Sequence, residues 1–301
     1  MKPGLASRLK TSGRGASLLL SVLATPAIVA VDHFVSSTSF VAIKPLLYLL
    51  IISISLALII YQWFIEKHLG QANNVLKSKI ATLECRSYVL AQISRLNERK
   101  VDCIRQRSYW DSSNTKDGNG YSVHQYLREC CKSLEDVIAH QLCCDVSNVD
   151  VSLIYRYVRD PLDSNWKWII GRSSLSNNCK LNDFIDAQNT LYHNLIYGQC
   201  DNPIFCNDKS SSDIYREGRR DKLFGGRGSF FAIQTELNNV EDELIDSVLL
   251  VSTYGVNFVS LDSGSKSVDE FKQLLSNQII PPYISLLQAE FAQLYMRHFF
   301  G

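Results

Sequence analysis

The chain has 301 residues, a formal net charge of +1 at pH 7, and hydrophobic residues at 46% of its positions. This length suffices for one sizeable domain with accessory segments. The near-neutral charge argues against nucleic acid as a partner, which needs a dominantly basic surface. The nine cysteines form no CxxC pair and no Cys/His quartet at zinc spacing, which favours reduced core cysteines in a reducing compartment.

Residues 45–65, PLLYLLIISISLALIIYQWFI, form an uncharged run that predicts a membrane-spanning helix. As a helix the run would extend about 31 Å, close to the thickness of a bilayer hydrocarbon core. Tyr61 and Trp63 stand at its end, where aromatic rings favour the membrane interface.

An earlier apolar run, residues 16–31, is open to three interpretations: a first span, a cleaved signal peptide or an interfacial segment. Four basic residues precede it and further lysines follow the second run, whereas the connection between the runs holds only Lys44 as a base. The positive-inside rule therefore predicts a basic cytoplasmic tail at 1–15 and a transmembrane hairpin at 16–65, with spans 16–35 and 45–65. The expected location is a bacterial inner membrane, multi-pass, with the C-terminal domain in the cytoplasm.

Residues 66–120 are expected to form a helical stalk and a linker. Leucines recur every seven residues at 69, 76, 83 and 90, with Asn97 next and Ile104 after it. A heptad repeat of this kind indicates a parallel coiled coil, and hence a homo-oligomer through residues 66–107. The alternative is a helix that packs on its own domain. The polar stretch DSSNTKDGNG, 111–120, marks the predicted domain boundary.

Residues 121–301 are predicted to form one α+β domain. Helical spacing covers 122–144, 181–199 and the C-terminal segment, where Pro281-Pro282 should interrupt or kink the helix. Strands are expected at 149–158, 166–171, 202–208, from Ser229 and from Asp246, the first two as a hairpin. The fold class is thus an antiparallel sheet with flanking helices, behind a transmembrane hairpin and a stalk.

The entry helix, VSLIYRYV, the closing pair GSFFAIQTEL and DSVLLVSTYGVNFV, and the exit helix resemble the GAF domain family over about 121–300. The resemblance lies in the order and character of the elements. The signature of the cyclic-nucleotide subclass and a bilin-bearing cysteine context are not recognisable. The resemblance implies a small-molecule sensory or dimerisation module with an unknown ligand or cofactor; a PAS-like sheet is the nearest alternative.

The stretch YREGRRDKLFGGRG, 215–228, contains the candidate ligand-binding residues Tyr215, Arg216, Arg219, Arg220 and Arg227. Guanidinium groups suit phosphate, and glycines would let backbone N–H groups approach an anion. A solvated loop and a partner-binding surface are the alternatives. Trp168 and Trp166 share one face of their strand and would line a pocket or belong to the core.

No GxxxxGK[ST], GxSxG or HExxH motif occurs, and the six histidines are scattered, so no enzymatic activity or metal site is expected. The first functional hypothesis is an oligomeric membrane sensor that binds a small, nucleotide-like anion and acts through its membrane segment. That layout is similar to bacterial membrane effectors of antiviral defence. The second hypothesis is a membrane scaffold whose degenerate GAF-like domain binds a partner protein.

Overall fold

The computed structural model describes residue 29 and residues 44–106, 122–160, 164–171, 181–188, 190–198, 200–262 and 264–300. The chain divides into two compact units, Met1–Ala81 and Thr82–Gly301. The predicted basic tail, the first span at 16–35 and the linker at 107–120 lie outside the described residues, apart from Val29.

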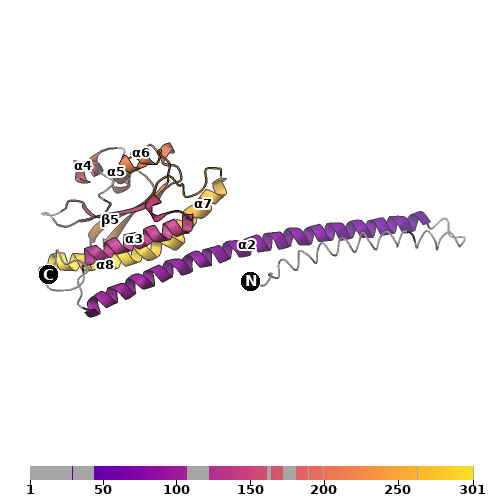
Figure 1. Cartoon of the computed structure of the whole chain (residues 1–301), viewed down its shortest axis with the longest axis horizontal. Coiled ribbons are helices and arrows are strands. Elements are labelled where there is room, and N and C mark those ends of the chain that lie inside the picture. Colours follow the sequence, from indigo (N-terminus) through magenta and orange to yellow (C-terminus); the bar gives the residue numbers. More distant parts are fainter. Residues whose placement is uncertain are drawn as a thin grey trace. The chain divides into compact units, whose positions relative to one another are not determined.

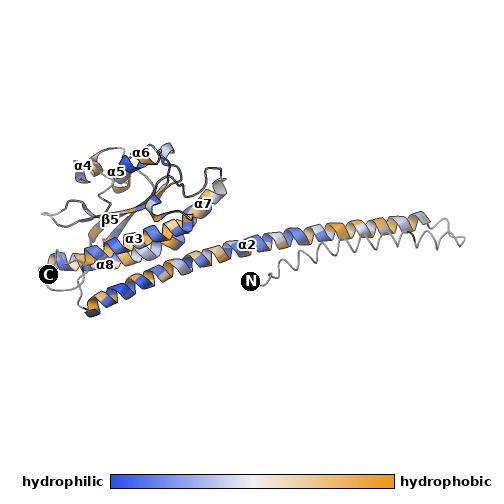
Figure 2. Ribbon diagram, viewed as in Figure 1, coloured by the Kyte–Doolittle hydropathy of each residue, from blue (hydrophilic) through white to orange (hydrophobic). Residues whose placement is uncertain are grey.

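A single long helix, α2 (Lys44–Gln106), contains the apolar run and most of the predicted stalk. Its sequence has no proline after Pro45 and one glycine, Gly70, so no backbone donor is missing along its length. Figure 2 shows the apolar residues concentrated toward its N-terminal end. Within the described part of the chain, α2 is the one helix long and apolar enough to cross a membrane.

The C-terminal unit is built on a five-stranded antiparallel sheet with strand order β2-β1-β5-β4-β3. The strands are β1 (Val149–Tyr157), β2 (Lys167–Ile170), β3 (Ile204–Cys206), β4 (Phe230–Asn238) and β5 (Glu243–Thr253). β1 and β2 form the predicted hairpin, and the apolar strand β5 lies at the centre. The antiparallel α+β architecture is therefore confirmed.

One face of the sheet packs against α3 (Val123–Leu142) and α8 (Ile280–Phe300), which lie side by side beneath it in Figure 1. Alternating β1 residues such as Val151 and Leu153 point to these helices, as their period of two requires. Residues 82–106 of α2 join the same core through Cys85, Val89 and Leu96. The predicted apolar face of α3 is buried as expected: Tyr126, Leu127, Cys130, Cys131, Leu134, Val137 and Ile138.

The opposite face of the sheet carries three short helices, α4 (Leu181–Asp186), α5 (Leu191–Ile196) and α6 (Arg219–Leu223) (Figure 1). The prediction of one helix over 181–199 is wrong, because the helix stops at Asp186 and restarts after Thr190. The Thr190 side chain accepts a hydrogen bond from His193 N and caps α5. Threonine, a favoured N-cap, marks the restart in the sequence.

The C-terminal segment contains α7 (Ser265–Leu274), a π-helical turn at Leu275–Ile279, and then α8. The predicted interruption is thus present but lies just before the two prolines. Pro281 and Pro282 occupy the first turn of α8, where a missing N–H is tolerated.

Candidate functional site

The arginine-rich stretch 215–228 is anchored by a buried aspartate. Asp221 lies in α6 and is 2% exposed. It accepts hydrogen bonds from Lys209 Nζ at 2.8 Å, from Tyr215 Oη at 2.9 Å and from the backbone N–H of Gly218 at 2.8 Å. The segment expected to be a loop therefore folds as a short helix around an inward-facing carboxylate.

Lys209, the partner of Asp221, begins a 3-10 turn at Lys209–Ser211, and its side chain is 1% exposed. Its ammonium lies 3.9 Å from the ring centroid of Tyr254 and 4.7 Å from that of Tyr215. Burial lowers the pKa of Lys209, while the hydrogen bond to Asp221 opposes that shift. Two aromatic faces and one carboxylate thus compensate the charge where water cannot.

A second ion pair lies beside the first. Arg220 is 3.4 Å from Asp150 of β1, its guanidinium lies 4.3 Å from the Tyr254 ring centroid, and it donates to the Ser147 carbonyl. Burial raises the pKa of Asp150, and Arg220 lowers it. Two cations and two carboxylates therefore balance within the cluster, and the Arg220 charge is already engaged by the fold.

Three glycines of this stretch have structural roles, two at the end of α6 and one beside β5. Gly226 N donates to Asp221 O at 2.8 Å and Gly225 N to Lys222 O at 3.3 Å, so both close the end of α6. Gly228 has φ +150°, and a Cβ there would lie 2.0 Å from the Thr253 carbonyl oxygen. Gly228 is therefore required for close approach of this stretch to β5.

The other predicted cations of the stretch point outward. Arg216 is exposed and donates to the Gln188 carbonyl at 2.9 Å, whereas Arg219, the first residue of α6, and Arg227 are exposed on the surface. The structure thus brings Tyr215 and Arg220 into the buried cluster and leaves Arg216, Arg219 and Arg227 outside it.

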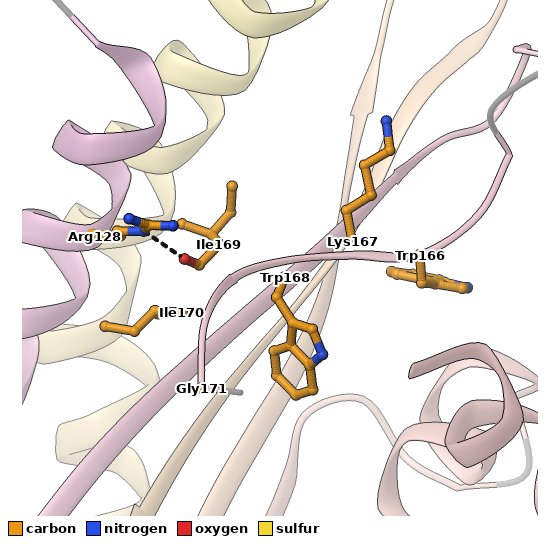
Figure 3. A pocket seen from close by; sticks show the side chains of 7 residues that line it. All are labelled: Arg128, Trp166, Lys167, Trp168, Ile169, Ile170 and Gly171. Atoms are coloured by element: carbon orange, nitrogen blue, oxygen red, sulfur yellow. Dashed lines mark hydrogen bonds between the residues drawn. The ribbon is translucent and has the colours of Figure 1, made fainter. Parts of the chain in front are cut away.

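Trp168, the remaining candidate, lies on β2 and lines an open groove of about 560 Å³ with Arg128 and residues 166–171 (Figure 3). Arg128 Nε donates to the Ile169 carbonyl at 2.9 Å across this groove. The Trp168 ring meets Tyr192 edge-on, with centroids 6.3 Å apart, and both Trp168 and Trp166 pack in the core beneath α4 and α5. Neither Tyr215 nor the predicted arginines line this groove.

The space between the sheet and α4 and α5 is filled by apolar side chains. Buried members of this cluster come from the helices and from three strands: Ile154, Leu181, Ile185, Leu191, Leu195, Phe230, Ala232 and Val248. Ser152 of β1 and Tyr192 of α5 share a buried hydrogen bond of 2.8 Å within it.

Reasoning from the sequence missed four residues of the cluster: Asp150, Lys209, Asp221 and Tyr254. One signal was available, because Asp221 stands three residues after Gly218 and completes a capping pattern at the start of α6. Lys209 sits in a polar run, NDKSSS, and nothing local distinguishes it from a solvated lysine.

Comparisons with known proteins give little further guidance. No protein-family profile matches the chain, and no curated protein matches it. Among solved structures, it is similar to the photoproduct state of GAF3 from Slr1393 of Synechocystis sp. PCC6803, with 17% identity over 56% of this chain and 99% of that chain, at a TM-score of 0.26. At so low a TM-score the fold rests on this chain's own features, an antiparallel five-stranded sheet with helices on both faces.

Proposed function

We propose that this chain is a non-enzymatic, membrane-anchored, oligomeric sensor whose GAF-like C-terminal domain binds a small anionic, nucleotide-like ligand and acts through its membrane segment. The observation that carries the proposal is the continuity of α2. One uninterrupted helix contains both the membrane-length apolar run and residues buried in the core of the C-terminal unit. A change in the packing of that core would act directly on the helix that enters the membrane.

Polar contacts fix the C-terminal part of α2 to the domain. The Tyr126 hydroxyl donates to Asn97 Oδ1 at 2.9 Å, and Lys100 pairs with Glu290 of α8, whose side chain is 1% exposed. Tyr88 stacks on His140 with ring centroids 4.0 Å apart. These contacts join residues 88–100 of α2 to both α3 and α8 within the C-terminal unit.

Self-association through residues 66–107 is part of the proposal. Leu69, Leu76, Leu83 and Leu90 are 48%, 57%, 65% and 53% exposed. At about 100° of rotation per residue, these leucines lie on a different face of α2 from the buried residues Cys85, Val89 and Leu96. The helix therefore packs on its own domain with one face and offers a heptad stripe of leucines on another, which suits a second copy of the same helix.

The proposed ligand surface is the cationic exterior of 215–228. Arg216, Arg219 and Arg227 are exposed there, and planar guanidinium groups bind phosphate in a bidentate manner. The buried cluster beneath supports this surface but contributes no net charge, because its two cations face two carboxylates.

The test is depolarisation of cells that express the full chain in the presence of its natural ligand. Arg219→Glu should abolish depolarisation without changing expression, and Lys272→Glu, at an exposed site on α7, is the matched control. Mass spectrometry of small molecules released from the purified full-length protein should identify the ligand. Depolarisation that persists unchanged in Arg219→Glu would contradict a ligand role for this surface.

Arg220→Glu is a separate experiment, because Arg220 contacts Asp150, Tyr254 and the Ser147 carbonyl. Charge reversal there should lower the melting temperature, which Arg219→Glu should not do. Loss of function in Arg220→Glu alone would therefore report on folding rather than on ligand binding.

A second candidate function is a membrane scaffold whose GAF-like domain binds a partner protein. The observation in its favour is that apolar side chains fill the space between the sheet and α4 and α5. On this alternative, a stoichiometric protein co-purifies with the full chain, and no small anion raises its melting temperature. Placement of either function in bacterial antiviral defence would be tested by phage challenge of cells with and without the gene.

A further inference from the structure

Three carboxylates converge beside the turn that joins β4 to β5, away from the arginine-rich stretch. They belong to Glu236, Glu243 and Asp246, and one oxygen from each lies within 4.8 Å of the others. Glu236 stands directly opposite Asp246 in the strand register. Like charges in directly opposed positions destabilise an antiparallel pair, so this arrangement needs a compensating positive charge.

A local irregularity in β5 creates the convergence. Ile245 pairs with Leu237 and Glu243 pairs with Asn238, so Leu244 has no partner on β4. A bulge of this kind reverses the alternation of side chains. Glu243 and Asp246, three residues apart, therefore reach the same site instead of opposite faces of the sheet.

The two oxygens of Asp246 differ in their surroundings. Oδ2 accepts from Arg156 Nε at 2.7 Å and from its Nη2 at 2.5 Å, and the Asp246 side chain is 1% exposed. Arg156 is in turn held over the Trp166 ring, with its guanidinium carbon 5.0 Å from the centroid. Oδ1 is buried and has no hydrogen-bond donor among the described residues. A buried carboxylate oxygen without a donor is costly. The Glu243 carboxyl supplies a donor when it holds a proton, since its hydrogen bond with Asp246 raises the pKa of Glu243 to about 7, and a bound cation would take the place of that proton.

The charge count indicates which charge that cation would carry. When all three carboxylates are ionised, the one guanidinium leaves two negative charges at the site, the charge that one divalent cation neutralises. Ligand chemistry points the same way, because all three donors are carboxylate oxygens, which suit hard cations rather than soft ones.

We propose that Glu236, Glu243 and Asp246 form a site for a hard divalent cation of the Ca²⁺ or Mn²⁺ type. The three oxygens all lie within 4.8 Å of one another, close enough for one cation to contact them all, and Ca²⁺ takes such ligands at about 2.3–2.6 Å in flexible geometry. Mg²⁺ demands near-ideal octahedral geometry and gives up its water less readily, so it suits a cluster of three carboxylates less well. Glu236 is exposed, so water can complete the coordination shell.

A cation bound here would connect the β4–β5 turn, through Asp246 and Arg156, to β1 and to the Trp166 ring. It uses none of the residues of the proposed ligand surface, so the two proposals stand or fall separately.

The test uses the full-length protein in an uncharged detergent, with Tb³⁺ as a luminescent probe excited through nearby tryptophan. Luminescence should saturate at one Tb³⁺ per chain and be displaced by Ca²⁺ or Mn²⁺ at lower concentration than by Mg²⁺. Glu243→Gln and Glu236→Gln should each weaken binding at least tenfold. The matched control is Glu241→Gln, an exposed carboxylate of the same turn outside the triad, which should bind as the parent does.

Thermal melting separates loss of the site from loss of the fold. In EDTA, Glu243→Gln should melt at or above the parent, because it removes a repulsion. In Ca²⁺ the parent should gain stability and Glu243→Gln should not. A luminescence signal that never saturates, or equal Tb³⁺ affinity in Glu243→Gln and the parent, would overturn the proposal.

Discussion

Asp221→Asn tests whether the buried ion pair under 215–228 holds that stretch in place. The substitution preserves the shape of the side chain but removes its charge. It also replaces one accepting oxygen with an NH₂ group, although Lys209, Tyr215 and Gly218 all donate hydrogen bonds to this side chain. Lys209 would then remain as a buried ammonium, 1% exposed, with its carboxylate partner gone. The loss in unfolding free energy is large because water does not reach the buried ammonium to replace the carboxylate.

The expected magnitude follows from the burial of both partners. Breaking a buried ion pair by removing one partner costs about 3–5 kcal/mol, because an uncompensated charge is left inside. The Tyr254 and Tyr215 rings beside the ammonium offset part of that loss, since a desolvated cation–π contact contributes about 2 kcal/mol. We expect Asp221→Asn to lower the free energy of unfolding of the C-terminal unit by about 1–3 kcal/mol.

Urea denaturation of the full-length protein in detergent, together with hydrogen exchange of peptides covering 209–228, measures this loss. Lys222→Met, at an exposed position of the same helix, is the control and should change stability by about 0.5 kcal/mol or less. The double variant Lys209→Met with Asp221→Leu should recover part of the loss, since no charge is then buried alone. A loss below about 1 kcal/mol in Asp221→Asn would refute the argument that this pair anchors the segment.

Three further outcomes follow from the packing. Leu83→Glu should break self-association in analytical ultracentrifugation, while Asn74→Glu, on the opposite side of the helix, should not. Burial raises the pKa of Glu135 to about 7 from its usual 4.5, so the folded state binds more protons between these values and stability falls as pH rises through them. Glu135→Gln should therefore flatten the dependence of the melting temperature on pH from about 4.5 to 7, while still accepting from Val151 N–H. Val89→Ala, at a fully buried site, should cost about 1.5–3 kcal/mol of unfolding free energy.

The regular parts of the fold follow from local patterns. The face of α3 and the alternation of β1 were both predictable, because a buried face repeats with the period of its element. The strand pair β1–β2 was predictable from a polar turn between two apolar runs. These features need no information from distant parts of the chain.

The candidate site was predictable only in part, because its contacts are long-range. Lys209 meets Asp221 twelve residues away, and Arg220 meets Asp150 seventy residues away, with the buried partners indistinguishable by type from solvated ones. The arginines and glycines of 215–228 suggested anion binding. In the structure the carboxylate of Asp221 is the anion that the buried Lys209 contacts, and Gly225 and Gly226 close the end of α6. The bulge at Leu244 is equally invisible in the sequence, since it depends on how β4 and β5 align.

The packing also limits how a ligand at 215–228 would influence α2. That segment lies on the α4–α6 face of the sheet, whereas α2 joins the core on the α3–α8 face. β1 connects the two: Ser152 bonds Tyr192 on one face, and the neighbouring Val151 N–H donates to Glu135 of α3 at 2.9 Å. A close-packed sheet shifts as a body, so a ligand acts only by favouring one of two packings of the sheet against α3 and α8. Such coupling is reciprocal, so if the proposed ligand and the proposed self-association through α2 are coupled, a variant that separates the helices should change ligand affinity by the same factor by which the ligand changes self-association.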